Sequence, residues 1–284
     1  MNIRAVCFLL MTGWMAFPAN AQQEITLEFS YMENTVFTIQ DELKSQMYMN
    51  YQGNNGQMPP QLVGKMPSIA DSRVEKLQKF TTGKVAEDGS YPVEMAILKN
   101  RQFVSMNQAE MKEVPQNENS MEGVIFSGRR TKDGKFIYEG TRGKPISAEQ
   151  KEIIKTVFSQ LGSLNELNGK KMKVGDTVSM DVPTALPFGQ GRNATMNTKT
   201  LFTLNRIEED LAFFDVRYQI EVSTDAGKGL SASGGGDGSI IYHTKLHYMS
   251  KMDTRMVMEM FISMGEGRMA IKSTTENHTV TTLN

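Results

Sequence analysis

Apolar and polar residues alternate with a period of two along most of the chain, which is typical of β-strands with one face in water. The clearest runs are Ile25 to Tyr31 and Tyr91 to Ile97. The pattern predicts a mainly β protein (β-rich α+β), built as one long curved antiparallel sheet or as two β-rich halves. Further strands are expected at residues 37–39, 47–51, 68–85, 124–126, 136–138, 178–182, 201–207, 213–222, 240–242, 246–252, 255–263 and 269–281.

Turn-forming residues separate these runs. Asp133-Gly134 predicts a tight hairpin between two short strands, and residues 208–210 form a second, acidic hairpin tip. Pro183 is expected to end the strand before it, because proline cannot donate to a central ladder. The Gly-rich stretch 231–238 is expected to be a mobile loop.

One helix interrupts the strands near the middle of the chain. Ser147 and Gln150 have the spacing of a capping box, in which each side chain meets the other residue's backbone amide. Apolar residues then recur at helical spacing until Gly162. The sequence therefore predicts one amphipathic helix from Ala148 to Leu161.

The first 21 residues have the features of a secretory signal peptide. Arg4 precedes an apolar stretch that reaches Phe17, and Ala19-Asn20-Ala21 supplies the small-x-small cleavage pattern. This stretch is too short to cross about 30 Å of hydrocarbon. We expect cleavage after Ala21 and a periplasmic or secreted protein without a transmembrane segment. The predicted organisation is signal peptide 1–21, N-terminal β-rich half 22–146, helix 147–162 and C-terminal β-rich half 163–284.

Composition narrows the classes of partner. The 31 Lys and Arg residues nearly balance 32 Asp and Glu, giving a net charge of −1. This balance argues against a nucleic-acid binder. The single Cys, Cys7, lies in the signal peptide, so the mature chain has no thiol and no disulfide. Because eukaryotic secreted proteins of this size usually carry disulfides, we favour a bacterial envelope protein.

The chain resembles a family of exported bacterial proteins that is classed as a domain of unknown function. The resemblance rests on Val174-Gly175-Asp176-Thr177, on the mid-chain helix and on the Gly-Asp-Gly sequence at 236–238, which leads into Ile240 and Tyr242. More distantly, the succession of long strands looks like the curved half-barrels of periplasmic lipoprotein carriers, which hold acyl chains in an apolar concavity. The resemblance implies a β fold and brings no catalytic residues.

Enzyme motifs are missing from the sequence. It has no Gly-x-Ser-x-Gly, and the Gly-rich stretch lacks the Gly-Lys-Ser/Thr that binds phosphate. A pair of carboxylates far apart in the sequence would leave no local motif, so glycoside hydrolysis stays open here. Carbohydrate sites usually display Trp, however, and the single Trp14 lies in the signal peptide. We expect a non-enzymatic protein with no catalytic residues and no cofactor.

Methionine is the unusual residue, with 22 in the chain and a concentration near its end. Met256, Met258 and Met260 are two residues apart, so on a strand they point to one face. Flexible thioethers fill uneven apolar space and adapt to varied ligands. We take these three as candidate ligand-binding residues, for an apolar small molecule or an envelope protein.

Two other classes of function stay open. Thioethers are soft ligands for Cu(I) or Ag(I), so Met249, Met252, His243 and His247 are an alternative metal-binding set. The two histidines lack the Glu of a zinc hydrolase, and we expect them to be solvent-exposed residues of a hairpin. The last class is a structural or interaction protein without any ligand.

Overall fold

The structure, a computed structural model, describes residues 23–284 except 30, 31, 54–57, 116–119, 161, 188–192, 225–228 and 265. The predicted signal peptide lies outside the described residues. No helix in the described ranges is long and apolar enough to cross a membrane.

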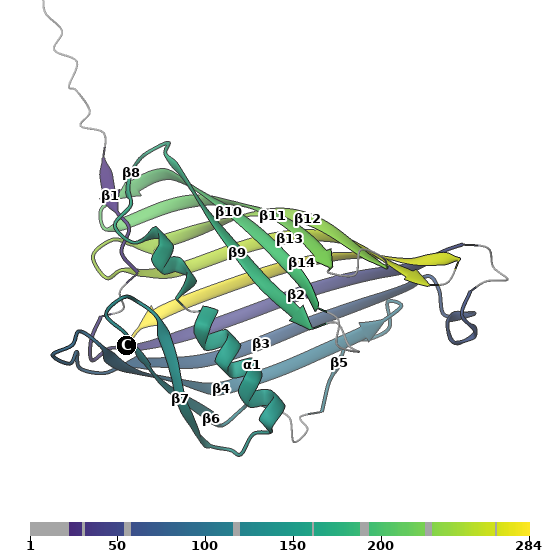
Figure 1. The fold of residues 1–284 in the computed structure, drawn as a ribbon, viewed down its shortest axis with the longest axis horizontal. Coiled ribbons are helices and arrows are strands. Elements are labelled where there is room, and N and C mark those ends of the chain that lie inside the picture. Colours follow the sequence, from purple (N-terminus) through teal and green to yellow (C-terminus); the bar gives the residue numbers. More distant parts are fainter. Residues whose placement is uncertain are drawn as a thin grey trace, which may run out of the picture.

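Long antiparallel strands form a single sheet of 12 strands, which confirms the predicted mainly β fold (Figure 1). The order across the sheet is β7-β6-β4-β3-β2-β14-β13-β12-β11-β10-β9, with β5 paired to β4. The contact between β2 and β14 joins strands from near the two ends of the described chain. The strands are β2 (Val36–Gln52), β3 (Ser68–Thr82), β4 (Tyr91–Met106), β5 (Lys112–Glu113), β6 (Val124–Arg130), β7 (Phe136–Gly143), β9 (Thr177–Pro187), β10 (Asn193–Glu208), β11 (Leu211–Thr224), β12 (Leu230–His243), β13 (Tyr248–Met264) and β14 (Gly267–Leu283).

The predicted helix forms as α1 (Ala148–Gln160) and is the one α-helix in the described part of the chain. Its capping box is present, because the Ser147 N–H donates to Gln150 Oε1 at 2.7 Å and the Gln150 N–H donates to Ser147 Oγ at 3.2 Å. Such a cap stabilises a helix by about 0.5–2 kcal/mol. The remaining elements are the 3₁₀ turns η2 (Pro60–Leu62) and η3 (Ser163–Leu167) and a small sheet of β1 (Glu24–Thr26) and β8 (Lys171–Lys173).

The large sheet has one apolar face, which we call the inner face, and two groups of short elements cover one end of it. Ile154 and Phe158 of α1 pack with Phe37 and Phe80 in one buried cluster. Segments β1, β8 and η3 cover the other cluster, in which Leu27 and strand residues from β9 to β12 are buried. Since side chains of a strand alternate between faces, inner-face residues are two apart along each strand. Burial of these two clusters holds the covering segments on the sheet.

The opposite face, which we call the outer face, carries rows of charged side chains. These pairs are solvent-exposed, and such pairs each contribute about 0–1 kcal/mol to stability. The charged rows keep this face in water, so the apolar surface of the sheet lies on the inner side. Ion pairs of the outer face include Glu42–Lys44 at 3.1 Å, Lys99–Glu75 at 2.8 Å, Arg255–Glu276 at 3.5 Å and Lys272–Glu259 at 3.6 Å.

The Gly-rich stretch 231–238 is not a loop, and the prediction of a mobile loop was wrong. These residues lie inside β12 and pair with both β11 and β13. Gly236 is directly opposite Met256 of β13, and a Cβ at Gly236 would collide with the carbonyl oxygen of Arg255. Glycine therefore allows β13 to approach β12 closely and the sheet to curve toward its inner face.

Three strand boundaries also differ from the sequence prediction. β9 continues through Pro183 because it is the edge strand, where a missing N–H breaks no ladder bond on the open side. The stretches 246–252 and 255–263 form one strand, β13, whose register shifts opposite Ile241 and Tyr242. The strand expected from Ile25 is only the three-residue β1, and 30–31 lie outside the described residues.

Candidate binding cavity on the inner face

A cavity of about 640 Å³ lies on the inner face, between the central strands and the segments that cover one end of the sheet. Its wall combines residues of β2, β3, β11, β13 and β14 with Phe29, Phe136 and Leu164 from the covering end. The volume is within the range of about 300–1,000 Å³ that is usual for small-molecule sites. Apolar residues of the sheet that line it include Phe37, Ile39, Leu43, Tyr248, Met252 and Met256.

Strand alternation explains why these side chains converge. Phe37, Ile39 and Leu43 occupy alternate positions of β2, and Phe37 is fully buried in the cluster beneath α1. Met252 and Met256 occupy the corresponding face of β13. Because β14 lies between β2 and β13 and contributes Asn277, Thr279 and Thr281 to the lining, these residues form two apolar rows on the inner face with polar side chains between them.

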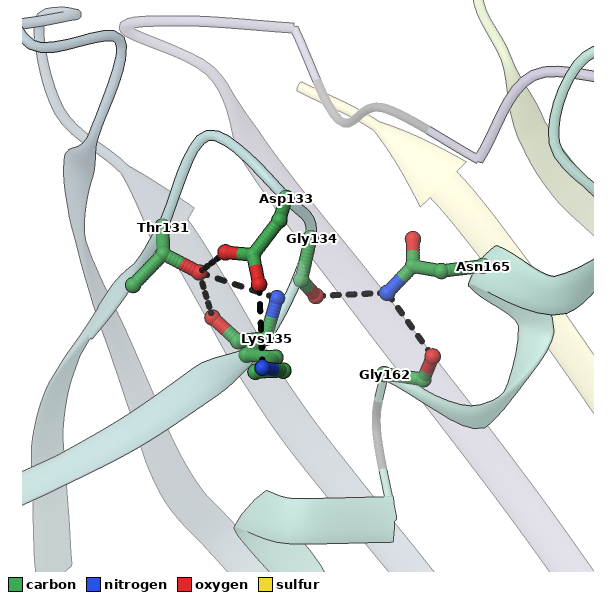
Figure 2. A network of polar contacts seen from close by, with 6 residues as sticks. All are labelled: Thr131, Asp133, Gly134, Lys135, Gly162 and Asn165. Atoms are coloured by element: carbon green, nitrogen blue, oxygen red, sulfur yellow. Dashed lines mark hydrogen bonds and ion pairs between the residues drawn. The ribbon is translucent and has the colours of Figure 1, made fainter.

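A polar network fixes the covering end of the cavity (Figure 2). The Asn165 side-chain amide donates to the carbonyl oxygens of Gly134 at 2.5 Å and Gly162 at 2.7 Å. Asn165 thereby ties the β6–β7 turn to η3, and the adjacent residues Phe136 and Leu164 line the cavity. This end is held by hydrogen bonds as well as by apolar contacts.

The β6–β7 turn is itself stabilised by hydrogen bonds (Figure 2). The Thr131 hydroxyl donates to Asp133 Oδ1 at 2.6 Å and accepts the Lys135 N–H at 3.0 Å. The Thr131 hydrogen bond, together with the Lys135 ammonium, lowers the pKa of the Asp133 carboxyl. Gly134 has a φ of 86°, a conformation that glycine adopts without strain, so the predicted Asp-Gly turn is confirmed.

A second network fastens the N-terminal segment to the tip of the β12–β13 hairpin. The Tyr242 hydroxyl donates to the Glu28 carbonyl at 2.6 Å and accepts the Glu28 N–H at 3.2 Å. His247 Nδ1 lies 3.2 Å from the same hydroxyl, and His247 Nε2 lies 3.5 Å from Glu28 Oε2. Burial raises the pKa of the Tyr242 phenol. The network holds Phe29, the next residue, against the cavity and within 5.5 Å of the Tyr242 ring centre.

The histidines are not the solvent-exposed hairpin residues that the sequence suggested, because neighbouring aromatic residues cover them. The His247 side chain is 28% exposed and lines the cavity. The His243 ring stacks on Tyr248 with centroids 5.8 Å apart, and its Nδ1 is buried without a hydrogen-bond partner in the described structure. Among the described residues, no three His, Cys, Asp or Glu side chains gather as a metal site.

The candidate methionines divide between the cavity and the surface that extends from it. Met256 lines the cavity, as do Met249 and Met252 of the alternative metal set. Met258 and Met260 follow Met256 on the same face of β13, opposite Gly234 and Ala232. They are half-buried and continue the apolar wall away from the covering end.

The Tyr218 side chain of β11 contributes to the cavity wall beside the glycines of β12, which have no side chains. It pairs with Gly236 across the β11–β12 ladder and lines the cavity. An aromatic side chain beside a glycine covers backbone that would otherwise be bare. Burial raises the pKa of the Tyr218 phenol to about 12.

A polar band runs beside the apolar wall. Asp41 of β2 pairs with Lys76 of β3 on one side and with Thr279 of β14 on the other. The Thr279 hydroxyl donates to Asp41 Oδ1 at 2.7 Å, and the Asn277 amide donates to the Thr279 hydroxyl at 3.2 Å. All four residues line the cavity. The cavity is therefore amphipathic.

Sequence reasoning missed this polar band and most of the aromatic wall. The signal for Asp41 was its position in the alternation, since it occupies an inner-face position between the apolar Ile39 and Leu43. A charged residue on an otherwise apolar strand face is an informative exception to the pattern. Lys76 and Tyr218 gave no such signal, because their partners are set by pairing between strands.

Comparisons with known proteins give no family assignment. No family model matches the chain, and no curated protein matches it. Among solved structures, OccK7 (OpdD) from Pseudomonas aeruginosa has a TM-score of 0.30 at 5% identity, covering 88% of this chain and 99% of that chain. An outer membrane channel from Pseudomonas putida F1 has a TM-score of 0.21 at 6% identity, covering 89% and 97%.

A Bacteroides fragilis protein with a YmcC-like fold, described as exported, has a TM-score of 0.17 at 10% identity, covering 87% and 96%. All three TM-scores are below 0.5, so none of these likenesses supports a statement about function in this chain.

Proposed function

We propose that the protein is a non-enzymatic component of the bacterial envelope that binds an apolar ligand in the inner-face cavity. The observation that carries this proposal is the cavity of about 640 Å³ with a wall of Phe37, Ile39, Met252 and Met256. Apolar surface of this kind gains about 25 cal/mol per Å² when a ligand removes it from water. The export signature of residues 1–21 supports the location.

The wall suits a ligand of variable shape. Methionine side chains are unbranched and polarisable, and they adapt to different apolar surfaces. Met249, Met252 and Met256 line the cavity, and Met258 and Met260 continue from it along β13. A flexible hydrocarbon chain fits such a wall better than a rigid planar molecule does.

Titration with N-phenyl-1-naphthylamine, a neutral apolar dye that fluoresces in apolar surroundings, tests the proposal. Met256→Trp introduces a larger side chain into the cavity, whereas Val257→Trp places the same side chain on the outer face of β13. We expect saturable binding to the native protein and to Val257→Trp, and at least about tenfold weaker binding to Met256→Trp. Equal binding by both variants, or no saturable binding, would refute the proposal.

Soft-metal binding is the second candidate, because Met249, Met252 and His247 line the same cavity. Thioether and imidazole ligands suit Cu(I). The test is competition for Cu(I) between the native protein and a chelator, with Met249→Leu/Met252→Leu as the matched variant. Competition by the native protein that the double variant loses would support this candidate, and the absence of competition at micromolar metal would eliminate it.

A further inference from the structure

Three residues with charged side chains, Asp41, Lys76 and Lys251, line the cavity; Lys251 forms an ion pair with Asp253 at 2.9 Å, whereas Asp41 and Lys76 form none with any residue that the structure describes. Asp41 and Lys76 are direct cross-strand partners on β2 and β3, and both line the cavity. Side chains at directly opposed positions have Cβ atoms about 4.5–5.5 Å apart. No ion pair joins the two side chains, and the Lys76 ammonium makes no hydrogen bond or ion pair to any residue that the structure describes.

The carboxylate of Asp41 is held in place while one of its oxygens stays available. Asn277 donates to Thr279 and Thr279 donates to Asp41 Oδ1, so this chain of hydrogen bonds fixes the carboxylate on the cavity wall. A carboxylate accepts about four hydrogen bonds in total. The pair therefore presents a free ammonium and a partly free carboxylate, side by side, to whatever fills the cavity.

On the outer face, in contrast, the neighbouring charged side chains form ion pairs. Glu42 and Lys44, the neighbours of Asp41 on the other side of β2, form an ion pair at 3.1 Å with each other. Glu75, the neighbour of Lys76, pairs with Lys99 at 2.8 Å. Asp41 and Lys76 thus differ from these neighbours in two ways: they lie on the inner face, and they form no ion pair with any residue that the structure describes.

We propose that the cavity binds a single-chain amphiphile with a zwitterionic head group, its phosphate on Lys76 and its ammonium on Asp41. This inference rests on the proposed function, since the hydrocarbon chain occupies the apolar wall. A purely anionic head group gains attraction from Lys76 but meets repulsion from Asp41, which is the direct cross-strand partner of Lys76. A head group with both charges gains attraction from each.

The size of the cavity supports one chain. A volume of about 640 Å³ is that of a site for one small ligand. The apolar wall of Met252 and Met256 begins directly beside the polar band, because Met252 pairs with Thr279 across β13 and β14. One amphiphile can therefore place its head group on the band and its chain on the wall.

Native mass spectrometry and calorimetric titration with three probes test the inference. The probes share one palmitoyl chain and differ in the head group: lysophosphatidylethanolamine is zwitterionic, lysophosphatidylglycerol is anionic and monopalmitoylglycerol is neutral. Each is used below its critical micelle concentration. We expect the native protein to bind the zwitterionic probe at least about tenfold more tightly than the other two.

Variants identify the groups responsible. Asp41→Asn and Lys76→Met should each remove most of the preference for the zwitterionic probe, and Asp41→Asn should strengthen binding of the anionic probe. Glu42→Gln and Lys44→Met, on the outer face of β2, are the matched controls and should keep the preference. Thermal unfolding of each variant shows whether the fold is retained.

The outcomes separate this inference from the proposed function. Equal affinity for all three probes, or tighter binding of the anionic probe, overturns the zwitterion inference and leaves apolar ligand binding in place. Loss of the preference in the outer-face controls also overturns it. Failure of all three probes to bind contradicts the proposed function itself.

Discussion

The Tyr242 hydroxyl both donates to the Glu28 carbonyl oxygen, at 2.6 Å, and accepts the Glu28 N–H, at 3.2 Å. A single side chain of β12 thus satisfies both backbone groups of a residue 214 positions away in the sequence. The neighbouring Phe29 lines the cavity, so this contact connects the stability of the N-terminal segment to the shape of the binding site.

Tyr242→Phe should lower the free energy of unfolding by about 1–3 kcal/mol, because it leaves two backbone polar groups of Glu28 without their partner. Urea unfolding measures the change. Tyr48→Phe is the matched control, since Tyr48 is 42% exposed, and it should stay within about 0.5 kcal/mol of the native protein. Equal effects of the two variants would show that the Tyr242 contact contributes nothing to stability.

Gly236→Ala should destabilise the protein by about 1–3 kcal/mol, because the added methyl group would collide with the Arg255 carbonyl oxygen and lie 2.9 Å from the Met256 Cα. Thermal unfolding measures the effect. Gly140→Ala is the control, since a Cβ there meets only the Ser127 Oγ at 3.8 Å. If Gly236→Ala is as stable as Gly140→Ala, the glycines of β12 do not serve the close approach of β13.

Asn165→Ala should cost about 1–3 kcal/mol in unfolding free energy, because the Gly134 carbonyl oxygen loses its donor and the Gly162 carbonyl oxygen keeps only the backbone N–H of residue 165. It should also weaken dye binding, since Phe136 and Leu164 are then less firmly held against the cavity. The exposed Asn205 on β10 provides the control variant Asn205→Ala, which should change neither quantity. Unchanged dye affinity in Asn165→Ala would show that the hydrogen bonds of Asn165 do not affect the binding site.

The raised pKa of Tyr218 predicts that the folded protein loses stability at high pH. Its pKa is about 12 in the folded protein and 10.0 for the free side chain, so the unfolded chain releases this proton first. The stabilisation is fully present below pH 10 and is lost as the pH rises through 12. Urea unfolding between pH 9 and pH 11 should show a smaller decline for Tyr218→Phe than for the native protein. The control Tyr48→Phe should decline as the native protein does.

The sequence pattern was sufficient for the fold class and for most strands. Alternation from Tyr91 to Ile97 predicted β4, and Ser147 with Gln150 predicted the start of α1. Both signals are local, because they depend on neighbouring residues along one strand or one helical turn. The same local reasoning correctly placed Met256, Met258 and Met260 on one strand face.

Features that depend on pairing between strands could not be read in this way. Gly234, Gly236 and Gly238 resemble a loop until β13 is placed beside them, since only the neighbouring backbone makes a Cβ unacceptable. The pairing of Asp41 with Lys76 likewise depends on the register between β2 and β3. The apolar ligand was a reasonable hypothesis from the methionines, but the polar band beside it required the assembled sheet.

The methionines themselves can report whether a ligand binds on the inner face. In a protein labelled with ¹³C at the methionine methyl groups, addition of the palmitoyl lysophosphatidylethanolamine should shift the signals of Met249, Met252 and Met256, which line the cavity. The exposed Met111, at 39% exposure and away from the cavity, should not shift. Shifts confined to Met111 and other exposed methionines, or no saturable shift at all, would contradict binding on the inner face.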